Sequence, residues 1–266
     1  MKMKKPEIGV MGQLTTKNIL DDLDFVIKND FQWFEIGLDW VQNFNLSDKT
    51  INEIKKRAEE SNVKLIIHTA WYLPTSSLLP EIKKGVIKNI KKAIVLADKV
   101  GSDRLTIHPG YREMPDPALE LTYSSLIDNL NKIVKNTKKY KVNICLENLD
   151  NMASYLCYNV KDYLRVLRAV RGLKTTLDIG HANTTETKPV EYLDNVKETI
   201  LNMHVHDNNG KNDEHKCIGE GNIDFIKLFK KCKEIDYYGP FILELFPYGN
   251  ILRGKEEFLK IWNNVT

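Results

Sequence analysis

The chain has 266 residues, of which 42% are hydrophobic and 28% charged, and its formal net charge is +3. A chain of this size and composition can bury a large core without disulfides or a structural metal. Only seven of its 39 basic residues are arginines, which dominate base and phosphate recognition, so the charge does little to favour a nucleic-acid partner. The four cysteines form no C-x-x-C pair and no apolar run approaches 18 residues, so we expect a cytoplasmic protein with reduced thiols.

Short runs rich in Ile, Leu and Val alternate along the chain with longer amphipathic stretches. The eight runs cover residues 7–12, 33–37, 63–68, 104–108, 142–148, 174–180, 200–207 and 240–246. Continuous apolar runs with polar flanks are typical of strands that are buried on both faces, as in a parallel sheet.

The stretches between the runs have helical periodicity. Ser47 is suited to cap one helix, residues 81–101 repeat an apolar side chain every three or four positions up to Gly101, and Asp116–Pro117 predicts a helix that begins near Ala118. Further helices are predicted over residues 17–28, 160–170, 189–197, 222–235 and 254–263.

Eight strand–helix units in one chain predict an α/β fold, a single (β/α)8 TIM barrel formed by residues 1–266 as one domain. No Pro/Gly-rich linker or low-complexity stretch divides the sequence. A doubly wound open sheet is the alternative, but "VMGQLTT" after the first run has one glycine and so lacks a glycine-rich phosphate loop.

Acids and histidines gather where the apolar runs end. The six histidines are His68, His108, His181, His204, His206 and His215, and the acids at or near run ends are Glu35, Glu147, Asp178 and Glu244. The carboxyl ends of barrel strands converge on one mouth, where isolated carboxylates would repel one another unless a cation is bound. Imidazoles mixed with carboxylates and no thiolate suit zinc, manganese, iron or cobalt, so we predict a divalent metal site.

The densest polar segment is "MHVHDNNGKNDEH", residues 203–215. His204 and His206 are two positions apart in a predicted strand, so their side chains share one face. The "NNG" sequence is typical of a turn, which would bring Asp213 and His215 back over the barrel mouth.

Six motifs along the chain carry a family likeness. They are "IIHTAWYL", "TIHPG", "CLEN", "LDIGHAN", "HVHDNNGKNDEHKCIGEGNIDF" and "ILELF". Through them essentially the whole chain resembles the xylose-isomerase-like TIM-barrel superfamily, in the branch shared by sugar-phosphate isomerase/epimerase proteins and AP endonuclease IV.

The resemblance implies a set of metal ligands for each branch. In the endonuclease branch a trinuclear zinc cluster would be held by His68, His108, Glu147, Asp178, His181, His204, Asp213, His215 and Glu244. Glu147 would then bridge two metals, and His181, Asp213 and His215 would hold the third. In the isomerase/epimerase branch one metal would be held by Glu147, Asp178, His204 and Glu244, with His181 contacting the substrate.

Two activities follow from this resemblance. We expect an isomerase or epimerase of a sugar, sugar phosphate or polyol, in which Glu147, Glu244 and His181 are catalytic and the glutamates transfer a proton at a metal-bound substrate. The alternative is a zinc phosphodiesterase that acts on abasic DNA or another phosphoester through a two- or three-metal cluster. The complete set of nine ligands favours the alternative. The segment "FEIGLDWVQNF" favours the isomerase, because it has Glu35 and no arginine where the endonucleases carry a Pro-Arg-rich loop.

A non-catalytic metal-binding or scaffold protein would have a broken ligand set, which this sequence does not show. We expect one to three divalent ions, zinc first, with manganese or cobalt as alternatives. The expected partner is a small sugar or sugar phosphate, or DNA if the protein is a phosphodiesterase. We expect no membrane association. The predicted substrate-binding residues are Trp71, Tyr72, His206, Arg112, Lys211 and Glu35. The aromatic pair would line a sugar pocket or penetrate DNA, and Arg112 and Lys211 are candidates for a phosphate clamp.

Overall fold

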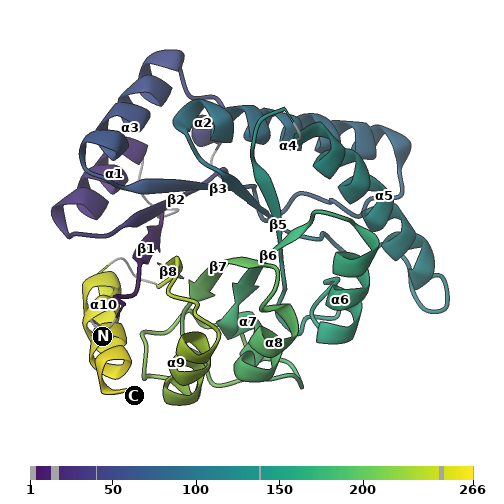
Figure 1. The fold of residues 1–266 in the computed structure, drawn as a ribbon. Helices are drawn as coiled ribbons and strands as arrows, with labels where there is room; N and C mark the ends of the chain where they lie inside the picture. Colours follow the sequence, from purple (N-terminus) through teal and green to yellow (C-terminus); the bar gives the residue numbers. More distant parts are fainter. Residues whose placement is uncertain (1–3, 13–17, 40, 138, 246–248, 266) are drawn as a thin grey trace.

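Eight parallel strands close into a barrel in the computed structural model, which describes residues 4–12, 18–39, 41–137, 139–245 and 249–265. Each strand pairs with the next along the chain, and β8 pairs with β1 to close the ring (Figure 1). The strands are β1 (Ile8–Met11), β2 (Trp33–Gly37), β3 (Lys64–His68), β4 (Arg104–Ile107), β5 (Asn143–Glu147), β6 (Lys174–Asp178), β7 (Ile200–Val205) and β8 (Phe241–Leu243). The predicted (β/α)8 barrel is therefore confirmed, and the open doubly wound sheet is excluded.

Helices surround the ring of strands (Figure 1). They are α1 (Ile19–Lys28), α2 (Val41–Phe44), α3 (Asp48–Glu60), α4 (Pro80–Val100), α5 (Leu119–Thr137), α6 (Val160–Ala169), α7 (Ile179–Asn183), α8 (Pro189–Val196), α9 (Phe225–Glu234) and α10 (Asn250–Asn264). The predicted ends agree with local chemistry, since the Ser47 side chain caps α3 and Gly101, at φ 82°, ends α4. No helix in the described ranges combines the length and apolar character needed to span a bilayer.

Some predicted bounds differ from the structure. The last helix begins at Asn250 rather than at residue 254, and β8 covers three residues of the run predicted over 240–246, whose last position lies outside the described residues. The start of the helix predicted over residues 17–28 falls partly outside the described residues, and α1 begins at Ile19. The short helices α2 and α7 were not predicted, because four or five residues are too few to show a helical period.

The alternation of side chains along each strand separates the core from the site. On β7, Met203 and Val205 join the apolar core beneath the helices, whereas Asn202 and His204 face the barrel interior. Inside the barrel, Trp33, Ile66 and Ile242 form a separate buried cluster. The interior is thus apolar at one level and polar at the level of Asn202 and His204.

Candidate metal centre

Glu147, the last residue of β5, is the buried carboxylate on which the other side chains converge. Its Oε2 lies 3.0 Å from Nε2 of His68 and 3.0 Å from Nε2 of His108. Its Oε1 lies 3.1 Å from Nδ1 of His204. We call His68, His108 and Glu147 the histidine-pair group.

His204, near the end of β7, is the centre of a second set of donors. Its Nδ1 lies 3.1 Å from Oε1 of Glu147, 3.1 Å from Oε1 of Glu244 and 3.8 Å from Oδ2 of Asp178. These four residues, the central group, come from the carboxyl ends of β5, β6, β7 and β8, as the barrel geometry predicts.

Asp213, on the loop that follows β7, is the centre of the third set of donors. Its Oδ2 lies 2.9 Å from Nε2 of His215 and 3.4 Å from Nε2 of His181, and its Oδ1 lies 3.4 Å from Nε2 of His206. The rings of His206 and His215 stack with their centroids 4.1 Å apart. We call these four residues the loop group.

Local sequence explains how the loop group is positioned. The side chain of Asp178 caps α7 by accepting the backbone N–H of His181, so the sixth strand and His181 are fixed together. Gly180 is required there, because a Cβ at this position would lie 1.8 Å from Cε1 of His206. His215 has φ 46°, a conformation uncommon for a histidine, which turns its ring back toward the site.

The donor set fits divalent cations. Two ligand atoms on one tetrahedral zinc lie roughly 3.3 Å apart, because each is about 2.0–2.1 Å from the ion. Within the histidine-pair and loop groups the contacts given above run from 2.9 to 3.4 Å. Nδ1 of His206 is buried and has no hydrogen-bond partner among the described residues. Nitrogen and carboxylate donors without a thiolate suit zinc, manganese or cobalt better than calcium or magnesium.

Glu147 and Glu244 have opposite electrostatic environments. Burial opposes the charge of Glu147, but the charges of His204 and His108 and their hydrogen bonds outweigh it and hold its pKa well below the usual value. Burial raises the pKa of Glu244, and the nearby charges of Glu147 and Asp178 raise it further against the opposing effect of His204. One carboxyl is therefore held ionised while the other is easier to protonate.

The metal-free protein should lose stability as the pH rises above neutrality. Burial alone would lower the pKa of His68 and His215, but the hydrogen bonds that they donate to Glu147 and Asp213, and the charges of those carboxylates, outweigh it and raise both pKa values to about 9. A raised histidine pKa contributes stability that is complete below the unfolded value of 6.5 and is lost as the pH rises through 9. Raising one histidine pKa from 6.5 to about 9 corresponds to about 3 kcal/mol, so we expect the melting temperature of the metal-free protein to fall by roughly 10 °C over that range.

Circular dichroism melts with and without Zn²⁺ would check this pH dependence. A metal-bound imidazole is already deprotonated, so the fall should be much smaller in the zinc-loaded protein. A flat profile for the metal-free protein would contradict the assigned ion pairs.

A cavity of about 300 Å³ opens onto these groups. Its described lining residues are Met11, Asp39, His68, Trp71, His108, Glu147, Leu149, Asp150, Tyr155, His181, Asp213, His215 and Glu244. None of them is a lysine or an arginine. The cavity therefore combines the candidate metal ligands with aromatic faces and two further carboxylates, Asp39 and Asp150.

The chain matches the xylose isomerase-like TIM-barrel family over residues 23–262. It belongs to this family. It is 32% identical to the uncharacterized protein MJ1311 of Methanocaldococcus jannaschii, over 93% of this chain and 87% of the relative. A crystal structure of a D-tagatose 3-epimerase-like protein superposes with a TM-score of 0.88 at 28% identity, covering 97% of this chain and 98% of that one.

Two relatives at lower identity have the names of enzymes of different kinds. The chain is 25% identical to fructoselysine 3-epimerase of Shigella flexneri, over 73% of this chain and 72% of the relative. It is 24% identical to a probable endonuclease 4 of Pediococcus pentosaceus, over 69% of this chain and 67% of the relative. The expected superfamily is thus confirmed, and the relatives include one protein from each of its two branches.

The structure brings all nine ligand candidates of this family resemblance together and adds His206 to them. His206 was predicted to bind substrate, but its Nε2 lies 3.1 Å from Oδ1 of Asp178 and the residue is fully buried. Asn148 supports the same region, because its side chain bonds both the backbone N–H and the carbonyl of Asp178.

Several predicted substrate-binding residues lie elsewhere. Trp71 lines the cavity, but the Tyr72 hydroxyl donates to the backbone carbonyl of Asp39, and Tyr72 is not among the described lining residues. Arg112 forms an ion pair with Asp116 at 2.6 Å rather than pointing into the cavity, and Lys211 is exposed on the loop after β7.

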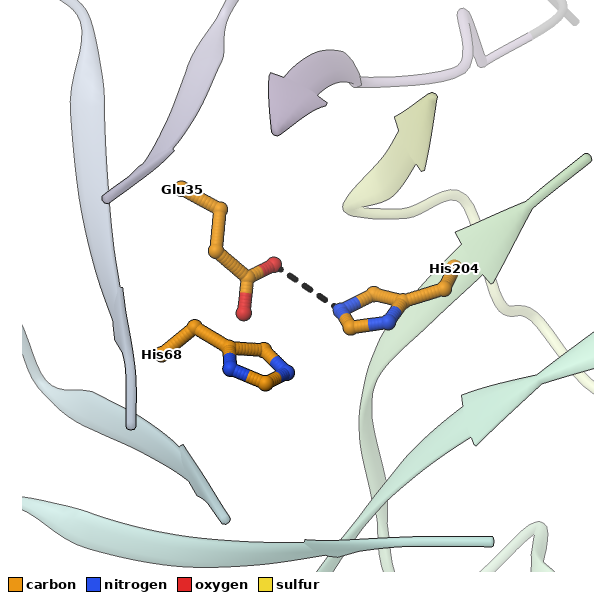
Figure 2. Close-up of side chains that lie close together, drawn as sticks. All are labelled: Glu35, His68 and His204. Carbon is orange, nitrogen blue, oxygen red and sulfur yellow. Dashed lines mark hydrogen bonds and ion pairs between the residues drawn. The ribbon is translucent and has the colours of Figure 1, made fainter. Parts of the chain in front are cut away.

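Glu35 needs a larger correction. It is fully buried, its Oε2 lies 3.0 Å from Nε2 of His204 (Figure 2), and it is not among the described residues that line the cavity. A position near a strand end therefore does not bring Glu35 to the cavity, because buried side chains hold its carboxylate inside the barrel.

The cavity also contains residues that the sequence analysis missed. Asp39 follows β2 by two residues, and Asp150 follows Glu147 by three. The strand-end rule that selected Glu147 could have found both, had it been extended past the last strand residue. Tyr155 and Leu149 carried no comparable signal.

Proposed function

We propose that this protein is a divalent-metal-dependent epimerase or isomerase that moves a proton at the carbon next to the carbonyl of a keto sugar. The observation that carries this proposal is the pairing of Glu147 with Glu244. Both line one cavity, both lie 3.1 Å from Nδ1 of His204, and their environments shift their pKa values in opposite directions. Such a separation of two carboxyl groups is typical of an acid and a base that work together.

The reaction needs one proton removed and one returned. The ionised Glu147 takes the proton from the carbon beside the carbonyl, which breaks the C–H bond and leaves its electrons on the carbonyl oxygen as an enediolate. Glu244, protonated, returns a proton to the other face of that carbon, so that the C–H bond re-forms with inverted configuration. His181 lines the same cavity and would hydrogen-bond a substrate oxygen. A divalent cation held by Glu147, Asp178, His204 and Glu244 would supply positive charge next to those oxygens.

The rest of the cavity supports an uncharged sugar rather than a sugar phosphate. Trp71 is 46% exposed and offers a flat apolar face for the C–H side of a sugar ring. Asp39 and Asp150 offer acceptors for hydroxyl groups. A phosphate would meet these carboxylates without a lysine or arginine among the described lining residues. The likeness to a D-tagatose 3-epimerase-like structure and to fructoselysine 3-epimerase points to the same reaction class.

The test is proton exchange with solvent. The zinc- or manganese-loaded protein would be incubated in D₂O with D-tagatose, D-fructose and fructoselysine, and the products followed by NMR. We expect deuterium at the carbon next to the carbonyl of the true substrate, together with its epimer or isomer. Conversion without deuterium in the product would contradict the proton-transfer proposal.

Changing Glu244 to glutamine should separate exchange from inversion. An amide cannot return a proton, but Glu147 could still remove and replace one on its own face. For the epimer whose proton faces Glu147, we expect deuterium in recovered substrate while epimer formation falls by about 10²-fold or more. Equal loss of exchange and epimerisation, with metal content unchanged, would contradict the two roles.

A second candidate is phosphoester hydrolysis by clustered metals. The observation that favours it is the division of the nine ligand candidates among the histidine-pair, central and loop groups, since one metal needs only the central group. Elemental analysis close to three zincs per chain, with metal-dependent nicking of a duplex that contains an abasic site, would favour this activity. A fully metallated protein that does not nick such a duplex would exclude abasic-site cleavage.

A further inference from the structure

The carboxylate of Glu35 is enclosed by three donors in the barrel interior. Thr106 Oγ1 donates to its Oε1 at 2.8 Å, and Asn202 Nδ2 donates to its Oε2 at 3.0 Å. Nε2 of His204 lies 3.0 Å from the same Oε2 (Figure 2). The residue is fully buried, both its oxygens have donors inside the barrel, and it is not among the described residues that line the cavity, so Glu35 is not placed to contact a substrate.

The His204 ring is oriented opposite to three other histidines of the site. His68, His181 and His215 each place Nδ1 against a backbone carbonyl, at 2.6 to 2.8 Å, and turn Nε2 toward a carboxylate of the site. His204 instead turns Nδ1 toward the carboxylates and Nε2 toward Glu35. Since a carboxylate can only accept, Nε2 of His204 donates a proton to Glu35. Nδ1 also faces carboxylates, so its lone pair becomes available only when a cation binds among them.

We propose that Glu35 is a positioning residue that fixes the ring orientation and tautomer of His204. By holding the Nε2 proton, it would leave the lone pair of Nδ1 available to a cation bound by the central group. This inference rests on the proposed metal-dependent function, because the lone pair matters only as a metal ligand. A carboxylate that accepts the hydrogen bond of an imidazole also makes that imidazole a stronger metal ligand than a neutral carbonyl in the same position would.

The surroundings of Glu35 are built to keep it in place. Asn202 lies two residues before His204 on the same face of β7, so a single strand presents both donors to one carboxylate oxygen. Thr106 also hydrogen-bonds Thr176, at 3.0 Å between their hydroxyl oxygens. The network thus joins β2, β4, β6 and β7 beneath the central group.

The test compares Zn²⁺ binding by calorimetry in the wild type, Glu35→Gln and Thr106→Val. Glutamine has the shape of glutamate without its charge, and we expect it to weaken one Zn²⁺-binding step by about 10- to 100-fold. Valine removes a donor to Glu35 but leaves the His204 contact, so its effect should be far smaller. Wild-type Zn²⁺ affinity in a folded Glu35→Gln protein would overturn the proposal.

A second measurement needs no change at Glu35. In the zinc-loaded wild type, a long-range ¹H–¹⁵N spectrum should show His204 protonated at Nε2 and not at Nδ1, with the signal assigned from its loss in His204→Gln. A proton on Nδ1 would overturn the proposal even if Glu35→Gln fails to fold. A failure of the proposed function would give a different result. The wild type and Glu35→Gln would then differ in Zn²⁺ affinity as expected, but the wild type would convert no keto sugar.

Discussion

Replacing Glu147 with glutamine should lower kcat/KM for the keto sugar by about 10³-fold or more. The amide keeps the shape of the side chain but cannot accept a proton from carbon. It also has one acceptor oxygen where the carboxylate has two, and those two face His68 and His108 on one side and His204 on the other. The change therefore removes both the proposed base and a ligand shared by two groups.

The measurements for Glu147→Gln are deuterium entry into substrate and metal content of the purified protein. Glu81→Gln, on the exposed surface of α4, is the matched control and should behave as the wild type. If Glu147→Gln keeps its metal and epimerises at the wild-type rate, Glu147 is not the base. If it loses abasic-site nicking instead, the phosphodiesterase is the activity.

The histidines and acids of the site could be predicted because parallel strands in a barrel share one direction. Once His68, Glu147 and Asp178 were assigned to strand ends, their convergence followed from the fold rather than from any contact between neighbours in sequence. Asp213 and His215 lie on a loop, and it was the family resemblance that identified them as metal ligands. In the structure Asp213 contacts both His181 and His215.

The ring orientation of each histidine could not be predicted in the same way. Whether Nδ1 or Nε2 faces the site depends on which acceptor lies behind the ring, and that acceptor comes from a distant strand. For His204 it is Glu35, 169 residues away in the chain. For the same reason the pattern that placed Glu35 near a strand end could not show that it lies beneath the site.

Charged residues on loops were the weakest part of the prediction. Arg112 and Lys211 were proposed as phosphate clamps because they follow strand-end motifs, but a loop side chain can turn to any nearby partner. Arg112 pairs with Asp116, four residues on, and that local pairing leaves the cavity without it. The resulting absence of lysine and arginine from the described lining is what favours an uncharged substrate over a phosphate.

The G-x-G-x-I part of the family motif has a physical explanation in Asp207, which is fully buried after β7. Its Oδ1 accepts the backbone N–H of Asn208 and Ile223, and its Oδ2 accepts those of Gly219 and Gly221. Gly221 has no space for a side chain, because a Cβ there would lie 2.2 Å from the carbonyl oxygen of Asn208. One carboxylate thus fixes the far end of the loop that carries Asp213 and His215.

Changing Asp207 to alanine should therefore destabilise the protein by about 4 kcal/mol, since four backbone donors would lose a buried charged acceptor. In a chain of this length that corresponds to a fall in melting temperature of about 10 °C. Asp224→Ala is the matched control, because Asp224 accepts the backbone N–H of Lys227 and pairs with its ammonium at the exposed start of α9, and the loss of these contacts should cost about 1 kcal/mol. Asp207→Asn keeps one of the two acceptor oxygens, so its loss of stability should be smaller than that of Asp207→Ala and larger than that of Asp224→Ala.

Urea unfolding and Zn²⁺ titration of the same three variants would separate stability from site geometry. Because the backbone of Asp207 also pairs with Lys216 in both directions, release of its side chain should loosen the segment between them, which carries Asp213 and His215. We therefore expect Asp207→Ala to bind less zinc than Asp224→Ala even where both are folded. Equal stability and equal zinc content in those two variants would show that the four hydrogen bonds to Asp207 do not hold the loop.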